Sequence, residues 1–140
     1  MASIEAIEGI GPANGKKLRA AGIKTCERLL IACCDKKGRK AMSAATGIGE
    51  GSLLEWANCA DLMRIKGVGS EYSDLLEAAG VDTVKELRRR NAENLTTAMV
   101  DCNAEHVKKT KKSIVRRTPS LSEVTRWIEH AKTLDPAITH

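Results

Sequence analysis

The 140-residue chain has almost no aromatic side chains: it contains no Phe, one Tyr and two Trp. Proteins that bind single-stranded nucleic acid stack successive bases on aromatic rings, and three rings cannot supply such a surface. The scarcity therefore argues against a protein that reads single strands or RNA loops. It also leaves Leu, Ile, Val, Ala and Met to build the core, a composition that favours closely packed helices over a β-sandwich.

Long apolar runs are also missing, because the longest, from Leu29 to Cys34, is far too short to cross a bilayer. The first eleven residues carry two glutamates and no basic cluster, unlike an export signal. We therefore expect a soluble, cytoplasmic protein without membrane contact. The five cysteines include no Cys-x-x-Cys pair, so we interpret them as reduced, buried thiols and expect no metal. The vicinal Cys33 and Cys34 leave a redox role open.

The net charge of +5 is unevenly distributed along the chain. Residues 1–60 carry nine basic and six acidic groups, residues 61–103 carry six and eight, and residues 104–140 carry eight and four. A small basic excess does not by itself identify a protein that binds nucleic acid. The positions of the charged clusters are therefore more informative than their total.

An internal repeat organises the chain. The segment from Ile7, IEGIGPANGKKLRAAGIKTCERLL, returns without a gap as the segment from Ile65, IKGVGSEYSDLLEAAGVDTVKELR. The shared positions include both glycines of a Gly-hydrophobic-Gly sequence and several apolar residues. We infer two related helical units, 1–60 and 61–118, followed by a C-terminal helix and tail over 119–140.

Each copy carries local signals for helices joined by tight turns. The glycines of Gly-hydrophobic-Gly allow positive φ in a turn between two helices, and Pro12 suits the first turn of the helix that follows. Gly22 and Gly80 are placed to end that helix. Thr25 and Thr83 then act as N-caps of a third helix.

A weaker third instance of the turn, Gly47-Ile48-Gly49, follows a predicted basic helix over 36–45. The corresponding stretch of the second unit, near 102–107, has no glycines, so an ordinary helix is one interpretation of it. A final helix begins at a capping box formed by Ser120 and Glu123. Its predicted core-facing stripe comprises Leu121, Val124, Trp127 or Ile128, Ala131 and Leu134.

These turns resemble a known motif. Gly-hydrophobic-Gly, a small residue and then a hydrophobic residue occur as Gly9, Ile10, Gly11, Gly15 and Leu18, and again as Gly67, Val68, Gly69, Ser73 and Leu76. The pattern is similar to the helix-hairpin-helix of DNA repair and recombination proteins. With GVDTVKELRRRN and RWIEHAK, nearly the whole chain resembles a family of small bacterial tandem helix-hairpin-helix proteins of unknown function. The resemblance implies an all-α fold of two helix-hairpin-helix (SAM-like) units with a C-terminal helix packed on them.

The resemblance also implies how the protein would bind duplex DNA. Backbone N–H groups at a helix N-terminus hold phosphates without reading base sequence, and by analogy two hairpins grip both strands. We expect Arg19 and the basic helix with Lys36, Lys37, Arg39 and Lys40 to add charge. The predicted phosphate-binding residues lie in the first and middle hairpins: Gly9, Ile10, Gly11, Ala13, Lys16, Lys17, Gly47, Gly49, Gly51 and Ser52.

The second copy differs, because Glu71, Asp74 and Glu77 occupy the helix that follows its turn. These carboxylates would repel a phosphodiester, so we expect this copy to be structural or to face a protein. Glu71, Asp74 and Tyr72, which we expect to be exposed, are the predicted protein-contact residues. The alternative to DNA binding is therefore an adaptor that docks a partner through the acidic second unit.

No arrangement in the sequence indicates catalysis. His106, His130 and His140 are isolated, and we interpret them as surface residues. We therefore expect no enzyme, no cofactor and no small-molecule substrate. Arg88, Arg89 and Arg90 favour a role at a helix C-terminus, whereas the basic run from Lys108 to Arg117 is either a solvated face or an extension of the phosphate track.

Overall fold

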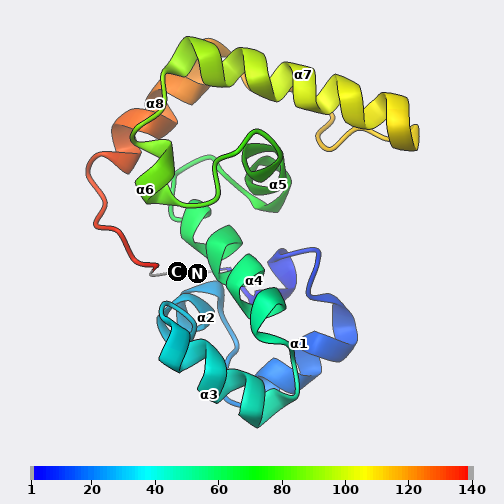
Figure 1. Cartoon of the computed structure of the whole chain (residues 1–140), viewed down its shortest axis with the longest axis vertical. Helices are drawn as coiled ribbons and strands as arrows, with labels where there is room; N and C mark the ends of the chain where they lie inside the picture. Colours follow the sequence, from blue (N-terminus) through cyan, green and yellow to red (C-terminus); the bar gives the residue numbers. More distant parts are fainter. Residues whose placement is uncertain (1, 139–140) are drawn as a thin grey trace. The chain divides into compact units, whose positions relative to one another are not determined.

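The computed structural model describes residues 2–138 and confirms an all-α fold (Figure 1). No sheet occurs within these residues, and their only strand-like pairing is an isolated bridge between Ser3 and Thr25. None of their helices combines the length and the apolar character that crossing a membrane requires. The elements are η1 (Ile4–Ala6), α1 (Gly11–Ala20), α2 (Cys26–Ala32), α3 (Lys36–Thr46), α4 (Glu50–Leu62), α5 (Ser70–Ala78), α6 (Val84–Leu87), α7 (Ala92–Thr110) and α8 (Leu121–Ala131).

The described chain divides into two compact units. The first comprises residues 2–61 with 137–138, and the second comprises Leu62–Pro136. The division lies one residue from the boundary that the repeat suggested. The C-terminal helix α8 belongs to the second unit, where it contacts α6 and α7.

The first unit is built around η1 and α1 to α4. Ile4, Ile10, Leu18, Leu29 and Leu53 are completely or almost completely buried and form the centre of its core. Local signals set the boundaries of its helices as predicted. Gly22 ends α1 with a φ of +88°, and the Thr25 hydroxyl accepts a hydrogen bond from the Arg28 N–H at the start of α2.

The second unit repeats this plan with α5 to α8. Its core includes Leu76, Leu87, Met99 and Val124, and Trp127 of α8 packs among them with 3% of its surface exposed. Thr83 caps α6 as predicted, and the Ser120–Glu123 capping box at the start of α8 is present in both directions. Leu121 was wrongly placed on the buried stripe: it is 45% exposed, because it lies in the first turn of α8 ahead of the buried face.

The link between α7 and α8 replaces the glycine turn that joins α3 and α4. The stretch near 102–107 lies inside the continuous helix α7, in agreement with the ordinary helix considered for it. Helix α7 ends at Thr110, and a loop over 111–120 leads to the start of α8 at Leu121. Asn103 holds this loop, because its side-chain oxygen accepts from the backbone N–H groups of Ile114 and Val115. Val115 is buried, as Ile48 is in the middle glycine turn.

Three of the five cysteines, Cys26, Cys33 and Cys59, are buried, whereas Cys34 and Cys102 are half-buried. Burial raises the pKa of the Cys33 thiol to about 11 and also raises the pKa of Cys26. Because the thiolate is the reactive form, these two side chains behave as small apolar groups near neutral pH.

Gly38 has a packing requirement that no motif indicates. It lies in the first turn of α3, where its N–H donates to the Asp35 carboxylate at 2.7 Å. A Cβ at this position would overlap the backbone carbonyl oxygen of Ala32. The close approach of α3 to the end of α2 therefore depends on the missing side chain.

We predict that Gly38→Ala lowers the free energy of unfolding by about 1–3 kcal/mol, because the backbone of α2 must shift to relieve the overlap. Gly51→Ala is the matched control, since a Cβ at Gly51 would meet no atom within 4 Å. Urea unfolding followed by circular dichroism measures both. Equal stability of the Gly38→Ala variant and the wild type would contradict the packing argument.

Candidate nucleic-acid interface

The first glycine turn, Gly9 to Gly11, leads directly into α1. The Ile10 side chain is buried, and its N–H donates to the Ile7 carbonyl at 3.2 Å. Pro12 lies in the first turn of α1 and carries no N–H. The first-turn donors left without an intrahelical partner are therefore the N–H groups of Gly11 and Ala13, neither of which is buried.

The two copies of the repeat do not form identical turns. In the first, the positive φ occurs at the second glycine, Gly11 (+68°), whereas in the second copy it occurs at the first glycine, Gly67 (+93°). Accordingly α1 begins at Gly11, but α5 begins one position later in the repeat, at Ser70. The two turns therefore differ in backbone conformation although their sequences align without a gap.

Lys16 and Lys17 follow the first turn on α1, and both are exposed. Within residues 2–138 neither takes part in an ion pair. Arg19, expected to act with them, instead binds the Glu5 carboxylate through two hydrogen bonds, Nε to Oε1 at 2.7 Å and Nη2 to Oε2 at 2.8 Å. Two cations rather than three therefore remain available beside this turn.

The Arg19 guanidinium holds the pKa of Glu5 at about 2, well below its ordinary value of 4.5, mainly through these hydrogen bonds. Because the pKa of this carboxyl is lower in the folded than in the unfolded protein, its ionised form stabilises the fold at pH values above the unfolded-state pKa. That contribution is lost as the pH falls from about 4.5 through about 2. The pair links α1 to η1, which precedes the turn.

The middle glycine turn, Gly47 to Gly49, joins α3 to α4. Gly47 has a φ of +76° and ends α3, where its N–H donates to the Ser43 carbonyl. The Ile48 N–H donates to the Thr46 hydroxyl at 3.2 Å, and its side chain is buried. The first turn of α4 then presents the N–H groups of Glu50, Gly51 and Ser52 to solvent, because all three residues are exposed.

Gly49 and Gly51 are not required by the fold. Neither has a positive φ, and a Cβ at either position would meet no atom within 4 Å. Gly51 lies within α4, where glycine is less favourable than alanine by up to about 1 kcal/mol. Gly49 precedes the first residue of α4, at the N-cap position, where glycine is tolerated better than alanine. The absence of side chains here leaves the backbone amides of α4 open to close approach from outside.

The basic helix α3 contributes three exposed cations, Lys36, Lys37 and Lys40. Arg39 was wrongly expected to join them. It is 4% exposed, and its guanidinium donates to the carbonyl oxygen of Cys33 at 3.0 Å. Arg39 therefore satisfies the backbone at the end of α2 and cannot reach a ligand in solvent.

The turn of the second unit, Gly67 to Gly69, is followed by exposed Glu71, Asp74 and Glu77 on α5. Tyr72 is not exposed as expected. Its ring packs on Trp127 with centroids 5.1 Å apart, and its hydroxyl donates to the Arg117 carbonyl at 3.0 Å. Of the three predicted protein-contact residues, Glu71 and Asp74 are therefore exposed and Tyr72 is not.

Two of the other arginines and one histidine have structural partners. Arg117 pairs with Glu123 at 2.7 Å, and Arg90 donates to the Gly80 carbonyl just beyond the end of α5. His106 and His130 are half-buried rather than on the surface, and His130 Nδ1 accepts from the Lys66 N–H at 3.1 Å. His140 lies outside the described residues.

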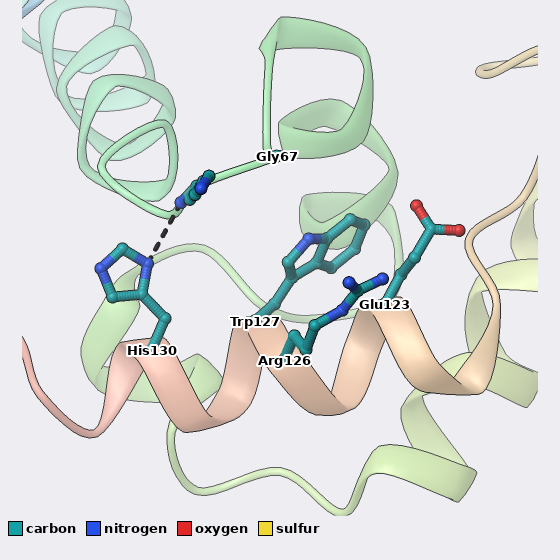
Figure 2. Close-up of a pocket in the computed structure, with 6 residues that line it drawn as sticks. Gly67, Glu123, Arg126, Trp127 and His130 are labelled. Carbon is teal, nitrogen blue, oxygen red and sulfur yellow. Dashed lines mark hydrogen bonds between the residues drawn. The ribbon is translucent and has the colours of Figure 1, made fainter.

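The sequence did not indicate one feature of the second unit. A pocket of about 440 Å³ opens beside Gly67, lined by Lys66, Glu123, Arg126, Trp127 and His130 (Figure 2). Its walls come from the turn before α5 and from α8, which are far apart in the sequence. The sequence could have shown only that the four lining residues of α8 are spaced i, i+3, i+4 and i+7, which places them on one side of a helix.

We predict that Arg19→Gln raises the pKa of Glu5 toward its ordinary value, by at least about one unit, because the main hydrogen-bond donor is lost. Titration of the Glu5 carboxyl carbon by NMR measures this pKa. Arg28→Gln, which removes an exposed arginine from α2, should leave it unchanged. A Glu5 pKa that stays near 2 in the Arg19→Gln variant would contradict the assignment.

Comparison with known proteins places the chain in a family but does not supply an activity. No curated protein and no solved structure matches it. One family model matches residues 8–134, which include all of α1 to α8 and most of both units. The chain therefore belongs to the family described as Domain of unknown function (DUF4332).

Proposed function

We propose that this protein is a non-catalytic, cytoplasmic tandem helix-hairpin-helix protein that binds duplex DNA. In this proposal the first unit holds backbone phosphates through the N–H groups at the starts of α1 and α4. Such contacts carry no base information, so binding shows little sequence preference. Lys16 and Lys17 supply the charge beside the first hairpin, and Lys36, Lys37 and Lys40 supply it in the helix that precedes the middle hairpin.

The observation that carries the proposal is the pair of glycines Gly49 and Gly51. Packing and backbone conformation leave both positions free to accept a side chain, yet both are glycine at the start of a helix. A Cβ at these positions would block a phosphate from the backbone N–H groups, whereas glycine, which has no Cβ, lets the phosphate reach them. The positive end of the helix dipole of α4 favours the same ligand.

The exposed charges of the first unit agree with this ligand. Lys16 and Lys17 have no ion-pair partner within residues 2–138, so their charge is available to a phosphate. Glu50 opposes it at the start of α4, and the exposed lysines of α3 offset this carboxylate in the field of the unit. The acidic α5 of the second unit would repel the same phosphates, which limits the proposed interface to the first unit.

The adaptor alternative has less support. It relied on Tyr72 as an aromatic contact residue, and that ring is already packed on Trp127 with its hydroxyl bonded. Without Tyr72, the acidic residues Glu71 and Asp74 do not distinguish a protein-binding surface from an ordinary charged helix surface.

We predict that the protein binds a fluorescein-labelled duplex with an affinity that falls as salt rises, at a slope of about −0.9 per phosphate neutralised. Lys16→Gln with Lys17→Gln should weaken binding about tenfold or more and reduce the slope by about 2. Fluorescence anisotropy over a salt series measures both quantities. The matched control is Lys85→Gln with Arg89→Gln, which removes two exposed cations from the second unit and should change neither.

Two results would count against the proposal. The first is the absence of salt-dependent binding at low ionic strength. The second is an equal loss of affinity in the two double variants, which would show that only the net charge of the chain matters.

We also predict that Gly51→Ala weakens duplex binding about tenfold while it leaves the fold intact or stabilises it slightly, because the added methyl group blocks the phosphate rather than the core. Gly69→Ala is the matched control: this glycine also opens a helix, and its Cβ would also meet no atom within 4 Å. Unchanged affinity in the Gly51→Ala variant would contradict the proposal that glycine at this position lets a phosphate reach the backbone amides of α4.

A further inference from the structure

The pocket of the second unit offers hydrogen-bond donors and almost no free acceptor. Figure 2 shows Trp127 and His130 projecting from α8 toward the segment that carries Gly67. The one carboxylate in the lining, Glu123, accepts hydrogen bonds from the Arg117 guanidinium and from the N–H and hydroxyl of Ser120. These bonds hold the pKa of Glu123 at about 2, so its charge is already balanced by Arg117.

The indole N–H of Trp127 is a donor without a hydrogen-bond partner in the described residues. The side chain is 97% buried, being 3% exposed, and Nε1 forms no hydrogen bond within residues 2–138. It lies against Gly67, where a Cβ would be 3.2 Å from it. Because Trp127 lines the pocket and no protein group accepts from its N–H, this donor is available to a ligand or a water molecule.

Two cations line the same pocket. Arg126 and Lys66 are exposed, and neither forms an ion pair with any residue in the described part of the chain. The position of Lys66 is set by His130, whose Nδ1 accepts the Lys66 backbone N–H at 3.1 Å. This bond requires the neutral imidazole with its proton on Nε2, so the ring adds a further donor rather than an acceptor.

We propose that this pocket binds the phosphate group of a small organic phosphate ester. Lys66 and Arg126 pair with the phosphate charge, and the Trp127 indole N–H donates to one of its oxygens. His130 is a positioning residue that holds the backbone of Lys66. The inference does not depend on DNA binding by the first unit.

The dimensions of the pocket favour a small molecule over a polymer. Its volume, about 440 Å³, is typical of small-molecule sites and far exceeds that of a bare phosphate, which leaves room for an organic group. The same unit carries exposed Glu71, Asp74 and Glu77 on α5. These carboxylates disfavour a long polyanion near the pocket far more than a single phosphate held inside it.

The indole N–H signals of the two tryptophans provide a direct test by NMR. Trp56→Phe identifies the Trp127 signal by elimination. We expect inorganic phosphate and a nucleoside monophosphate to shift the Trp127 signal saturably. The matching nucleoside without phosphate, and sodium chloride at the same ionic strength, should not shift it.

Charge-removing variants then locate the ligand. Arg126→Gln and Lys66→Gln should each weaken phosphate binding about tenfold or more, as expected for loss of a charge-assisted hydrogen bond. Arg116→Gln removes an exposed arginine of the same unit that does not line the pocket and should leave the affinity unchanged. The dispersion of the amide spectrum verifies that each variant is folded.

Three outcomes would overturn the proposal: a Trp127 shift that chloride reproduces, equal affinities of the Arg126→Gln and Arg116→Gln variants, or a shift caused by duplex DNA alone. The last would assign the pocket to DNA backbone phosphates. The Lys16 and Lys17 variants separate this inference from the proposed function, because they should weaken duplex binding and leave the Trp127 titration unchanged.

Discussion

In each unit a buried tryptophan packs against the first glycine of a turn, and this contact joins the last helix of the unit to its first turn. In the first unit a Cβ at Gly9 would lie 3.4 Å from Trp56 Nε1, and in the second a Cβ at Gly67 would lie 3.2 Å from Trp127 Nε1. The tryptophans come from α4 and α8, the last helices of their units, and both are buried. A Cβ would fit at Gly9 in ordinary contact, whereas at Gly67 the approach is tighter and the φ of +93° also favours glycine. In both units the contact brings the last helix onto the first turn and closes one core.

The two units differ in the groups that surround this shared contact. In the first, α1 and α4 begin at glycine turns with exposed N-termini, and α1 carries the exposed Lys16 and Lys17. In the second, Tyr72 packs on Trp127, the α5 surface is acidic, and the donor-rich pocket lies beside Gly67. The change of charge on α5 and the replacement of the α3–α4 turn by the 111–120 loop account for the divergence, while the cores remain equivalent.

The sequence predicted which residues of the candidate interface are glycines at turns and cations on helices, but not which of those cations are paired within the fold. Gly11, Gly47 and the two lysines of α1 lie in the exposed turns and helix starts that the repeat predicted. Arg19 and Arg39 were counted as free cations because the sequence does not show which groups they contact in the fold. Glu5 is fourteen positions from Arg19, and the Cys33 carbonyl is accessible to Arg39 only because α2 and α3 pack together.

The sequence by itself determined the side-chain caps, most of the helices and the positions of the glycine turns. These depend on backbone φ preferences and on hydrogen bonds between residues three or four positions apart, so local residue types are sufficient. Only the tertiary structure decided which charges are free, that Tyr72 is half-buried, that Gly38 admits no side chain, and that Lys66, Arg126 and Trp127 share a pocket. Those outcomes depend on which segments distant in sequence come into contact, and packing of the whole core sets those contacts.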